Sequence, residues 1–497
     1  MIKQHIKQLI FLIYLLVFSI SYIPTPARAI ALLTETFELY LPWVTHQGQT
    51  HSVFLNPENR KEQVFQLTDG NERKDKAPPG GLASVGDDLE IFLPRVSYQG
   101  ELYSASLHHI GNGHFQIKNA ARISMPEDRG TVLSVQLMET RTAAQIANEY
   151  PFTALAGLNP RYDVAVYRIG YQTLDAFGNL TAASGVIGAP IGIPVGAPML
   201  SFQHGTITNN DHAPSVNPEE TGADLALFLM GARGYLTVIP DYLGFGDSNG
   251  LHPFMHAKTL AWAVIDLIRA VRSLAAASGY PLNGQLFLTG YSEGGYATMA
   301  AQREIEIHHA DEFVITASAP MAGAYDLSGT MLQLVLTDEP LPRTMYFPYL
   351  LLAYNQIYGF DDEITNLLAG DFDPAVLELF DGRHDSDTIN AALPNIPGAL
   401  FAPGLLDILK SGEHHPVRTA LKNNDVYRWT PASPTRLYHC LDDDRVPYAN
   451  AIVAIEHFTA AGADVKLETL FSGNHVDCAI PALLSGNGWF DSLVELP

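Results

Sequence analysis

The spacing of apolar positions changes at about residue 162, and this change predicts where the main fold begins. From there on, short apolar runs alternate with long segments whose apolar residues recur at helical spacing. The segment after Pro253 carries one such stripe on one helix face, formed by Leu260, Val264, Leu267, Ile268, Val271 and Leu274. Strands that alternate with such helices are typical of an α/β protein with a mostly parallel sheet. The predicted strands are Met199–Phe202, Tyr235–Pro240, Gln285–Thr289, Val314–Ala317, Arg436–Cys440 and Val465–Phe471.

The alternation of strands and helices stops between about residues 327 and 430. This stretch is rich in helix formers and aromatic residues, as in Tyr346–Tyr354, and it lies between two predicted strands. We therefore expect a helical cap at 327–430, inserted into an α/β domain that spans residues 150–497.

The part of the chain before this domain contains an internal repeat. Residues 39–55 align without gaps on residues 91–107, and seven of the 17 positions are identical. Apolar residues alternate on both sides of a Gln-Gly turn in each copy, which predicts two β-hairpins. Residues 69–86 are rich in Gly, Lys, Asp and Pro and are expected to link the copies. Residues 30–130 are thus a predicted β-rich region, either a surface-binding module or a structural appendage.

Residues 1–29 have the pattern of a secretory signal peptide. Two lysines precede an apolar stretch over residues 9–23, and an Ala-Arg-Ala sequence offers a small-residue cleavage site that ends at Ala29. We expect cleavage after Ala29 and a secreted or periplasmic protein, with a retained membrane anchor as the alternative. No later apolar run is long enough to span a bilayer, so the mature chain is expected to have no membrane span.

The composition excludes one large class of partners. Hydrophobic residues make up 47% and charged residues 16% of the chain, which is typical of a folded globular protein. The formal net charge is −24, from 29 Lys and Arg against 53 Asp and Glu. A nucleic-acid-binding face needs clustered Lys and Arg, so no nucleic acid partner is expected.

A G-x-S-x-G motif, the signature of an activated serine, occurs twice, around Ser248 and around Ser292. The chemistry needs a strand, a strained turn that exposes the hydroxyl, and then a helix. Ser292 follows the predicted strand Gln285–Thr289 and precedes a run of helix formers from Tyr296 onward. Ser248 lies in a Gly-rich loop followed by Leu-His-Pro, and is expected to be an ordinary turn serine. Ser292 is therefore the predicted nucleophile.

A serine hydroxyl needs a base, and the base needs an acid to orient it. In this arrangement the chain order is Ser, then Asp or Glu, then His. His475 follows the last predicted strand, in a loop, and is the predicted base. Three carboxylates follow the preceding strand, and Asp443 is the predicted acid because it stands in a D-x-x-V-P sequence. Asp442 and Asp444 remain alternatives.

The negative oxygen of a tetrahedral intermediate needs two backbone N–H donors. One is expected from Glu293, the residue after the nucleophile, and one from the loop after an earlier strand. That loop reads Gln-His-Gly-Thr and ends at Thr206, which is the predicted second donor. Gly205 and Ile207 are the alternatives.

Together these motifs make the sequence resemble the α/β-hydrolase superfamily, and within it the secretory lipases and esterases. The motifs are Gln-His-Gly-Thr (203–206), Pro-Asp-Tyr-Leu-Gly-Phe-Gly-Asp-Ser (240–248), Gly-Tyr-Ser-Glu-Gly-Gly (290–295), Asp-Asp-Arg-Val-Pro (443–447) and Gly-Asn-His (473–475). The resemblance covers residues 150–497 and excludes the repeat. It implies an α/β-hydrolase fold, Ser292, Asp443 and His475 as a catalytic triad, and Thr206 and Glu293 as oxyanion donors.

The implied function is a secreted serine hydrolase that cleaves small-molecule or lipid carboxylic esters through an acyl-enzyme, without a cofactor. A serine exopeptidase is the alternative on the same fold, because an acyl-enzyme mechanism serves amides as well. A non-catalytic binding protein that keeps the hydrolase fold is the third possibility. His252 and His256 are four residues apart but are interrupted by Pro253, so no metal site is expected there.

The only two cysteines, Cys440 and Cys478, flank the predicted acid and base. Cys440 lies three residues before Asp443, and Cys478 lies three residues after His475. An acid and a base that are hydrogen-bonded bring these two loops together, and an exported protein can oxidise its thiols. A Cys440–Cys478 disulfide is therefore predicted, with two buried free thiols as the alternative.

Overall fold

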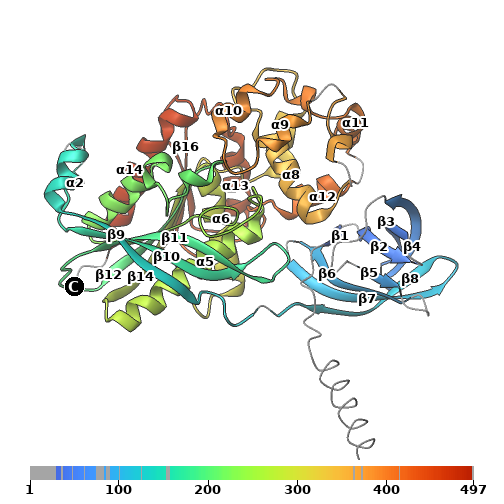
Figure 1. The fold of residues 1–497 in the computed structure, drawn as a ribbon, viewed down its shortest axis with the longest axis horizontal. Helices are drawn as coiled ribbons and strands as arrows, with labels where there is room; N and C mark the ends of the chain where they lie inside the picture. The colour runs from blue at the N-terminus through green and yellow to red at the C-terminus, as the bar shows by residue number, and fades with distance from the viewer. Residues whose placement is uncertain are drawn as a thin grey trace, which may run out of the picture.

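The computed structural model describes residues 30–34, 37–46, 49–60, 62–73, 83–85, 90–99, 101–124, 126–152, 157–361, 364–370, 373–412 and 415–494. The predicted signal peptide, 1–29, lies outside the described residues. Within them, two sheets organise the chain (Figure 1).

The larger sheet has nine strands and carries the predicted α/β pattern. Its strands are β9 (Val132–Arg141), β10 (Val164–Leu174), β11 (Leu180–Pro190), β12 (Ala197–Gln203), β13 (Leu236–Pro240), β14 (Leu282–Tyr291), β15 (Ala317–Met321), β16 (Thr435–His439) and β17 (Val465–Thr469). Their order across the sheet is β17-β16-β15-β14-β12-β13-β11-β10-β9. All pairs from β13 to β17 are parallel, whereas β9, β10 and β11 add an antiparallel edge.

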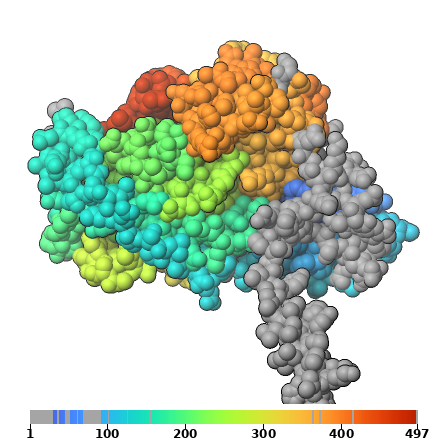
Figure 2. Space-filling model, in the orientation of Figure 1, coloured from blue at the N-terminus to red at the C-terminus, as the bar shows by residue number. Residues whose placement is uncertain are grey.

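Helices flank this sheet and fill the insertion between β15 and β16. The α-helices are α2 (Ala143–Glu149), α4 (Ala223–Leu225), α5 (Ala257–Ser278), α6 (Glu293–His308), α7 (Leu332–Val335), α8 (Tyr346–Tyr358), α9 (Ala375–Glu378), α10 (Ser386–Ala391), α11 (Pro403–Ser411), α12 (Pro416–Asn423), α13 (Ala449–Ala460) and α14 (His475–Asp491). Short 3₁₀ or π segments are η1 (Asn210–His212), η2 (Pro218–Thr221), η3 (Ala226–Met230), η4 (Leu327–Met331), η5 (Ile364–Leu367) and η6 (Pro397–Leu400). The orange segment with α8 to α12 lies over the green and yellow body in Figure 2.

The smaller sheet contains the internal repeat. Its strands are β1 (Ala31–Leu33), β2 (Leu39–His46), β3 (Gln49–Asn59), β4 (Val64–Arg73), β5 (Ala83–Val85), β6 (Glu90–Tyr98), β7 (Glu101–Gly111) and β8 (His114–Arg122). Leu39 pairs with Leu55 in the β2–β3 hairpin, and Ile91 pairs with Leu107 in the β6–β7 hairpin. Both hairpins shift register after the Leu of Leu-Pro. The repeated sequence therefore encodes the same hairpin twice, down to the position of its irregularity.

The two copies also exchange short strands. β1 pairs in parallel with β6 of the second copy, while β5 pairs in parallel with β2 of the first. Each copy thereby supplies a strand that covers part of the other, and their inner faces share one apolar core that includes Leu41 and Leu93. Two hairpins with one apolar face each cannot exclude water separately, but they can against one another.

The repeat unit packs on both the body and the cap. The hydroxyl of Tyr40 donates a 2.7 Å hydrogen bond to the carbonyl oxygen of Gly359, which ends α8. Strand β1 contacts α12 of the cap. Glu101 lies 2.8 Å from both Lys258 of α5 and His308 of α6. The unit is thus connected to α6, the helix that follows Ser292.

Four expectations differ from the structure in detail. β9 belongs to the large sheet although it precedes residue 150, because it pairs along β10. Residues 69–86, expected to be a linker, include the end of β4 and all of β5. Helix α5 is buried on every side over residues 257–268 rather than along one stripe. Strand β15 begins at Ala317, where the predicted strand ends, and Val314 is 76% exposed.

Close packing explains the position of β15. A Cβ atom on Gly295 of α6 would lie 2.1 Å from the carbonyl oxygen of Met321. The helix therefore approaches this strand at backbone distance, and the small residues of Ala-Ser-Ala-Pro fit where the β-branched Val-Ile-Thr does not. The high β-propensity of Val-Ile-Thr favoured residues 314–316 as strand, whereas packing against α6 places the strand after them.

Candidate active site

Ser292 lies at the sharp turn between β14 and α6. Its φ of 61° and ψ of −122° are unusual for a residue with a side chain. The turn is held by close contacts: a Cβ on Gly294 would lie 1.9 Å from the carbonyl oxygen of Gln203, so only glycine fits. The Ser292 N–H also donates to the Met321 carbonyl at 2.9 Å. The fold thus lifts one hydroxyl out of the strand end and fixes it.

His475 brings this hydroxyl together with a carboxylate. Its Nε2 atom lies 2.8 Å from Ser292 Oγ, and its Nδ1 atom lies 2.7 Å from Asp443 Oδ2. His475 is the first residue of α14, with Asn474 as the helix cap, rather than part of a loop as expected. The three predicted residues therefore form one continuous hydrogen-bonded chain.

Asp443 is the member of the Asp442–Asp444 run that contacts the imidazole. Its Oδ1 atom accepts the N–H groups of Arg445 at 3.0 Å and Val446 at 2.8 Å. Asp442 accepts a bond from Ser472, and Asp444 accepts the backbone N–H of His475 at 3.0 Å. All three carboxylates thus have hydrogen-bond partners, but only one orients the ring.

A second histidine, which sequence reasoning missed, contacts Asp443. His439 Nε2 lies 3.2 Å from Asp443 Oδ2 and 2.9 Å from the Val446 carbonyl oxygen, and both side chains are fully buried. Burial alone would raise the pKa of the Asp443 carboxyl, but the hydrogen bonds from His439 and His475 bring that pKa below its ordinary value. The carboxylate therefore stays ionised at neutral pH. The only sequence signal for His439 was its place at the end of a predicted strand.

The predicted oxyanion donors both line the cavity that contains Ser292. Glu293 is the first residue of α6, where backbone N–H groups have no partner inside the helix. Thr206 lines the same cavity as Ser292 and Glu293. The loop before Thr206 is held by His204, whose Nδ1 lies 2.7 Å from the Gly205 carbonyl oxygen and whose ring stacks on Tyr242.

An apolar cavity opens at Ser292. Cap residues form most of its wall, and Ser292 is the only serine among the described residues that line it. The apolar lining residues are Phe254, Met255, Ala324, Leu327, Met331, Leu332, Val335, Tyr346, Phe347, Leu350, Leu351, Phe401, Leu405, Leu409, Val417, Leu421 and Val446. Ser248, by contrast, is buried in the loop after β13, where its N–H donates to the Phe245 carbonyl oxygen.

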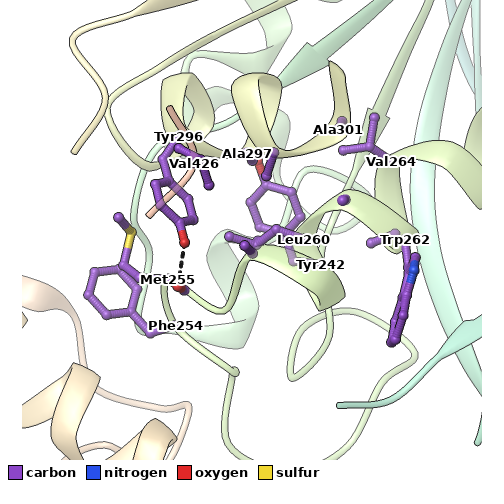
Figure 3. Packing of buried hydrophobic residues seen from close by; sticks show 14 of the residues in the cluster. Tyr242, Phe254, Met255, Leu260, Trp262, Val264, Tyr296, Ala297, Ala301 and Val426 are labelled. Carbon is purple, nitrogen blue, oxygen red and sulfur yellow. Dashed lines mark hydrogen bonds between the residues drawn. The ribbon is translucent and has the colours of Figure 1, made fainter. Parts of the chain in front are cut away.

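Helix α6 also supports the wall of this cavity. Tyr296, one turn after the Ser292 turn, is fully buried, and its hydroxyl donates a 2.8 Å hydrogen bond to the carbonyl oxygen of Met255 (Figure 3). Met255 and Phe254 in turn face the cavity. The same helix therefore positions the nucleophile and part of the apolar surface next to it.

The predicted disulfide is confirmed. Cys440 and Cys478 are bonded, their Cα atoms are 6.0 Å apart, and both side chains are buried. The bond joins the acid loop after β16 to helix α14, which begins at His475.

His252 and His256 do not come together. His252 lies 2.8 Å from a carboxylate oxygen of Glu293, whereas His256 lies 3.2 Å from Thr259 Oγ1. Elsewhere, Glu101, Glu304 and His308 are close enough to share an ion. However, the ammonium group of Lys258 already lies between them, 2.8 Å from Glu101 and 3.3 Å from Glu304. The ammonium group therefore forms ion pairs with both carboxylates.

Known protein families and solved structures include relatives of this chain. A model of the secretory lipase family matches residues 214–489, more than half of the chain. The chain belongs to the secretory lipase family. A search of curated protein sequences finds no match. Membership of this secretory family implies that the protein is secreted.

Solved structures resemble this secretory lipase family member over a longer part of the chain than the family model matches. A putative hydrolase from Legionella pneumophila is 29% identical, with a TM-score of 0.68, over 73% of this chain and 98% of its own. The rice cell wall degrading esterase LipA from Xanthomonas oryzae is 30% identical, with a TM-score of 0.66, over 73% and 97%. Candida antarctica lipase A in its closed state shares the fold at 17% identity and a TM-score of 0.57, over 74% and 84%.

These likenesses confirm the expected α/β-hydrolase fold and carboxylic ester hydrolase activity. Among the helices of the described residues, none is long and apolar enough to cross a membrane.

Proposed function

We propose that this secretory lipase is a serine hydrolase that cleaves esters of apolar acyl chains through an acyl-enzyme. The observation that carries the proposal is the chain of hydrogen bonds from Ser292 through His475 to Asp443, at 2.8 and 2.7 Å. These distances lie within the reach that proton transfer between a nucleophile and its base requires.

The positions of these atoms support the following reaction. Ser292 Oγ attacks the ester carbonyl carbon while His475 Nε2 takes its proton, and Asp443 stabilises the imidazolium that results. The N–H groups of Glu293 and Thr206 bind the negative oxygen of the tetrahedral intermediate. His475 then gives the proton to the leaving alcohol. A water molecule repeats the same steps on the acyl-enzyme, which releases the acid and restores Ser292.

The cavity supports an apolar acyl group as the part of the substrate that is bound. Its wall is almost entirely aliphatic and aromatic, and it opens at the nucleophile. Transfer of a hydrocarbon chain from water into such a cavity is favourable, because apolar surface is buried. Transfer of a charged peptide terminus is unfavourable there, because the charge loses its hydration. The wall is built largely from cap residues, so we assign acyl selectivity to the cap at 327–430.

Two serine variants test the proposal on one substrate panel. The panel is a series of p-nitrophenyl esters from acetate to palmitate, with aminoacyl p-nitroanilides as peptidase substrates. Ser292→Ala should lower kcat by about 10⁶-fold. Ser248→Ala is the matched control, because it changes the serine of the second G-x-S-x-G motif, and it should retain most activity. Activity that survives in Ser292→Ala would show that the nucleophile is misassigned, and faster cleavage of the anilides would favour an exopeptidase.

We further propose that the signal peptide is cleaved after Ala29, so that the secreted chain begins at Ile30. N-terminal sequencing of the exported protein tests this directly. A first residue other than Ile30 would place the cleavage elsewhere.

A further inference from the structure

A buried histidine, His252, forms a hydrogen bond with the buried side chain of Glu293, the residue whose backbone N–H is a proposed oxyanion donor. His252 lies in the loop between β13 and α5, and Glu293 follows the nucleophile. The distance from His252 Nε2 to Glu293 Oε1 is 2.8 Å, and the two side chains are 1% and 2% exposed. Neither side chain has a part in the mechanism above, which uses only the backbone N–H of Glu293.

The hydrogen bonds of His252 fix the number of protons on this pair. Its Nδ1 atom lies 2.6 Å from the carbonyl oxygen of Leu243, which can only accept, so Nδ1 carries a proton. The contact between Nε2 and the Glu293 oxygen needs one further proton. With that proton on nitrogen the pair is an imidazolium and a carboxylate, and with it on oxygen both groups are neutral. In either form the pair has no net charge.

The surroundings hold His252 in this orientation. Its ring centroid lies 4.8 Å from that of Phe245, 5.9 Å from Tyr242 and 6.1 Å from Tyr349. A Cβ on Gly244 would lie 2.5 Å from the His252 backbone, so the preceding turn packs directly against it. Such an apolar enclosure makes an unpaired carboxylate costly, because no water replaces a lost partner.

We propose that His252 is a positioning residue for the oxyanion site, on the condition that Ser292 is the nucleophile proposed above. By sharing one proton with Glu293 it holds this carboxyl group in place and keeps the His252–Glu293 pair without net charge. The negative oxygen of the tetrahedral intermediate forms at the Glu293 N–H. An uncompensated carboxylate on the same residue would repel that oxygen in a site of low dielectric. The neutral ester in the ground state carries no such charge, so the effect acts on kcat rather than on KM.

Three variants separate charge from structure. His252→Phe fits the aromatic surroundings but leaves Glu293 without its proton donor, and we expect kcat to fall about 100-fold with little change in KM. Glu293→Gln keeps a hydrogen bond, because its amide can donate to the neutral imidazole, and should lower kcat about threefold. The double variant His252→Phe/Glu293→Gln has no carboxylate to repel the oxyanion, and should recover to within about tenfold of the wild type.

His256→Phe is the matched control. It removes a buried imidazole four residues along, which bonds to Thr259 rather than to Glu293, and kcat should stay within about twofold of the wild type. Circular dichroism and labelling of Ser292 by a fluorophosphonate report how much of each variant is folded, and kcat is expressed per labelled site.

The inference is overturned if the double variant is no more active than His252→Phe, or if His252→Phe raises KM and leaves kcat unchanged. Ser292→Ala, measured in the same assay, keeps this outcome distinct from failure of the proposed function. Loss of all activity in Ser292→Ala upholds the nucleophile whatever the His252 variants do. Retained activity there refutes the nucleophile, and the inference falls with it.

Discussion

Replacement of Asp443 by asparagine tests the proposed acid, and the structure indicates how the substitution acts. The Asp443 carboxylate is the acceptor in four hydrogen-bond contacts. Its Oδ2 atom lies 2.7 Å from His475 and 3.2 Å from His439, and its Oδ1 atom accepts the N–H groups of Arg445 and Val446. Asparagine has one acceptor oxygen and one NH₂ group that can only donate, so it cannot accept hydrogen bonds on both sides.

Each orientation of the new amide has a definite cost. With its oxygen toward the histidines, its NH₂ group faces two backbone N–H groups, and two buried donors lose their acceptor. With its oxygen toward the backbone, its NH₂ group faces His475 Nδ1 and His439 Nε2. In the second orientation the NH₂ group meets a donor only at His439, whose Nε2 keeps its proton because it bonds to the Val446 carbonyl oxygen. His475 can change tautomer, so its Nδ1 can accept from the NH₂ group. We therefore expect the second orientation.

In that orientation His475 carries its proton on Nε2 and presents a donor to Ser292. The serine then has no base, and kcat should fall about 10⁴-fold, or about 5 kcal/mol of transition-state stabilisation. Initial rates on p-nitrophenyl butyrate, per fluorophosphonate-reactive site, measure the loss. The His439 conflict should also lower the free energy of unfolding by about 1–3 kcal/mol, which urea denaturation measures.

Asp442→Asn and Asp444→Asn are matched controls in the same loop. Asp442 accepts a hydrogen bond from the exposed Ser472 side chain, and Asp444 accepts the backbone N–H of His475 rather than a ring N–H. Both variants should lose less than about tenfold in kcat. If either of them loses more activity than Asp443→Asn, the acid is misassigned.

Three further changes have expected outcomes. Cys440→Ala/Cys478→Ala opens a loop of 38 residues, and should lower the free energy of unfolding by about 4 kcal/mol in urea; two reactive thiols in the denatured, unreduced wild type would contradict the bond. Burial alone would raise the pKa of Glu101, but the bonds from His308 and Lys258 lower it to about 2. The Glu101 carboxylate therefore stabilises the fold at pH values above its unfolded pKa of about 4.3, and this contribution is lost as the pH falls towards 2. In Glu101→Gln, the fall of Tm between about pH 4.3 and 2 should be smaller than in the wild type. Leu421→Trp fills part of the cavity and should lower kcat/KM for palmitate about tenfold relative to acetate; an unchanged ratio would place the acyl chain elsewhere.

Local geometry accounts for what could be predicted from the sequence. A nucleophile turn needs a strand, glycines and a helix within about a dozen residues, so Ser292 could be distinguished from Ser248 without a structure. The duplicated hairpins of residues 39–55 and 91–107 were equally readable, since alternation and a turn act between neighbours in the chain. Two cysteines allow only one intramolecular pair, and their spacing from the acid and base indicated it.

Contacts between distant segments decided the rest. The D-x-x-V-P sequence favoured Asp443 over its two neighbours, but the contact of 2.7 Å with the imidazole is formed only when the loop folds against His475. Strand β15 is formed by Ala-Ser-Ala-Pro-Met rather than by Val-Ile-Thr, because α6 approaches the strand at backbone distance. The residues of α6 that allow this approach lie more than twenty positions earlier in the chain. The bond between His252 and Glu293 joins residues 41 apart, and neither motif predicts the other. Sequence patterns report forces between near neighbours, whereas burial and hydrogen-bond partners are fixed only when the sheet and its helices close around them.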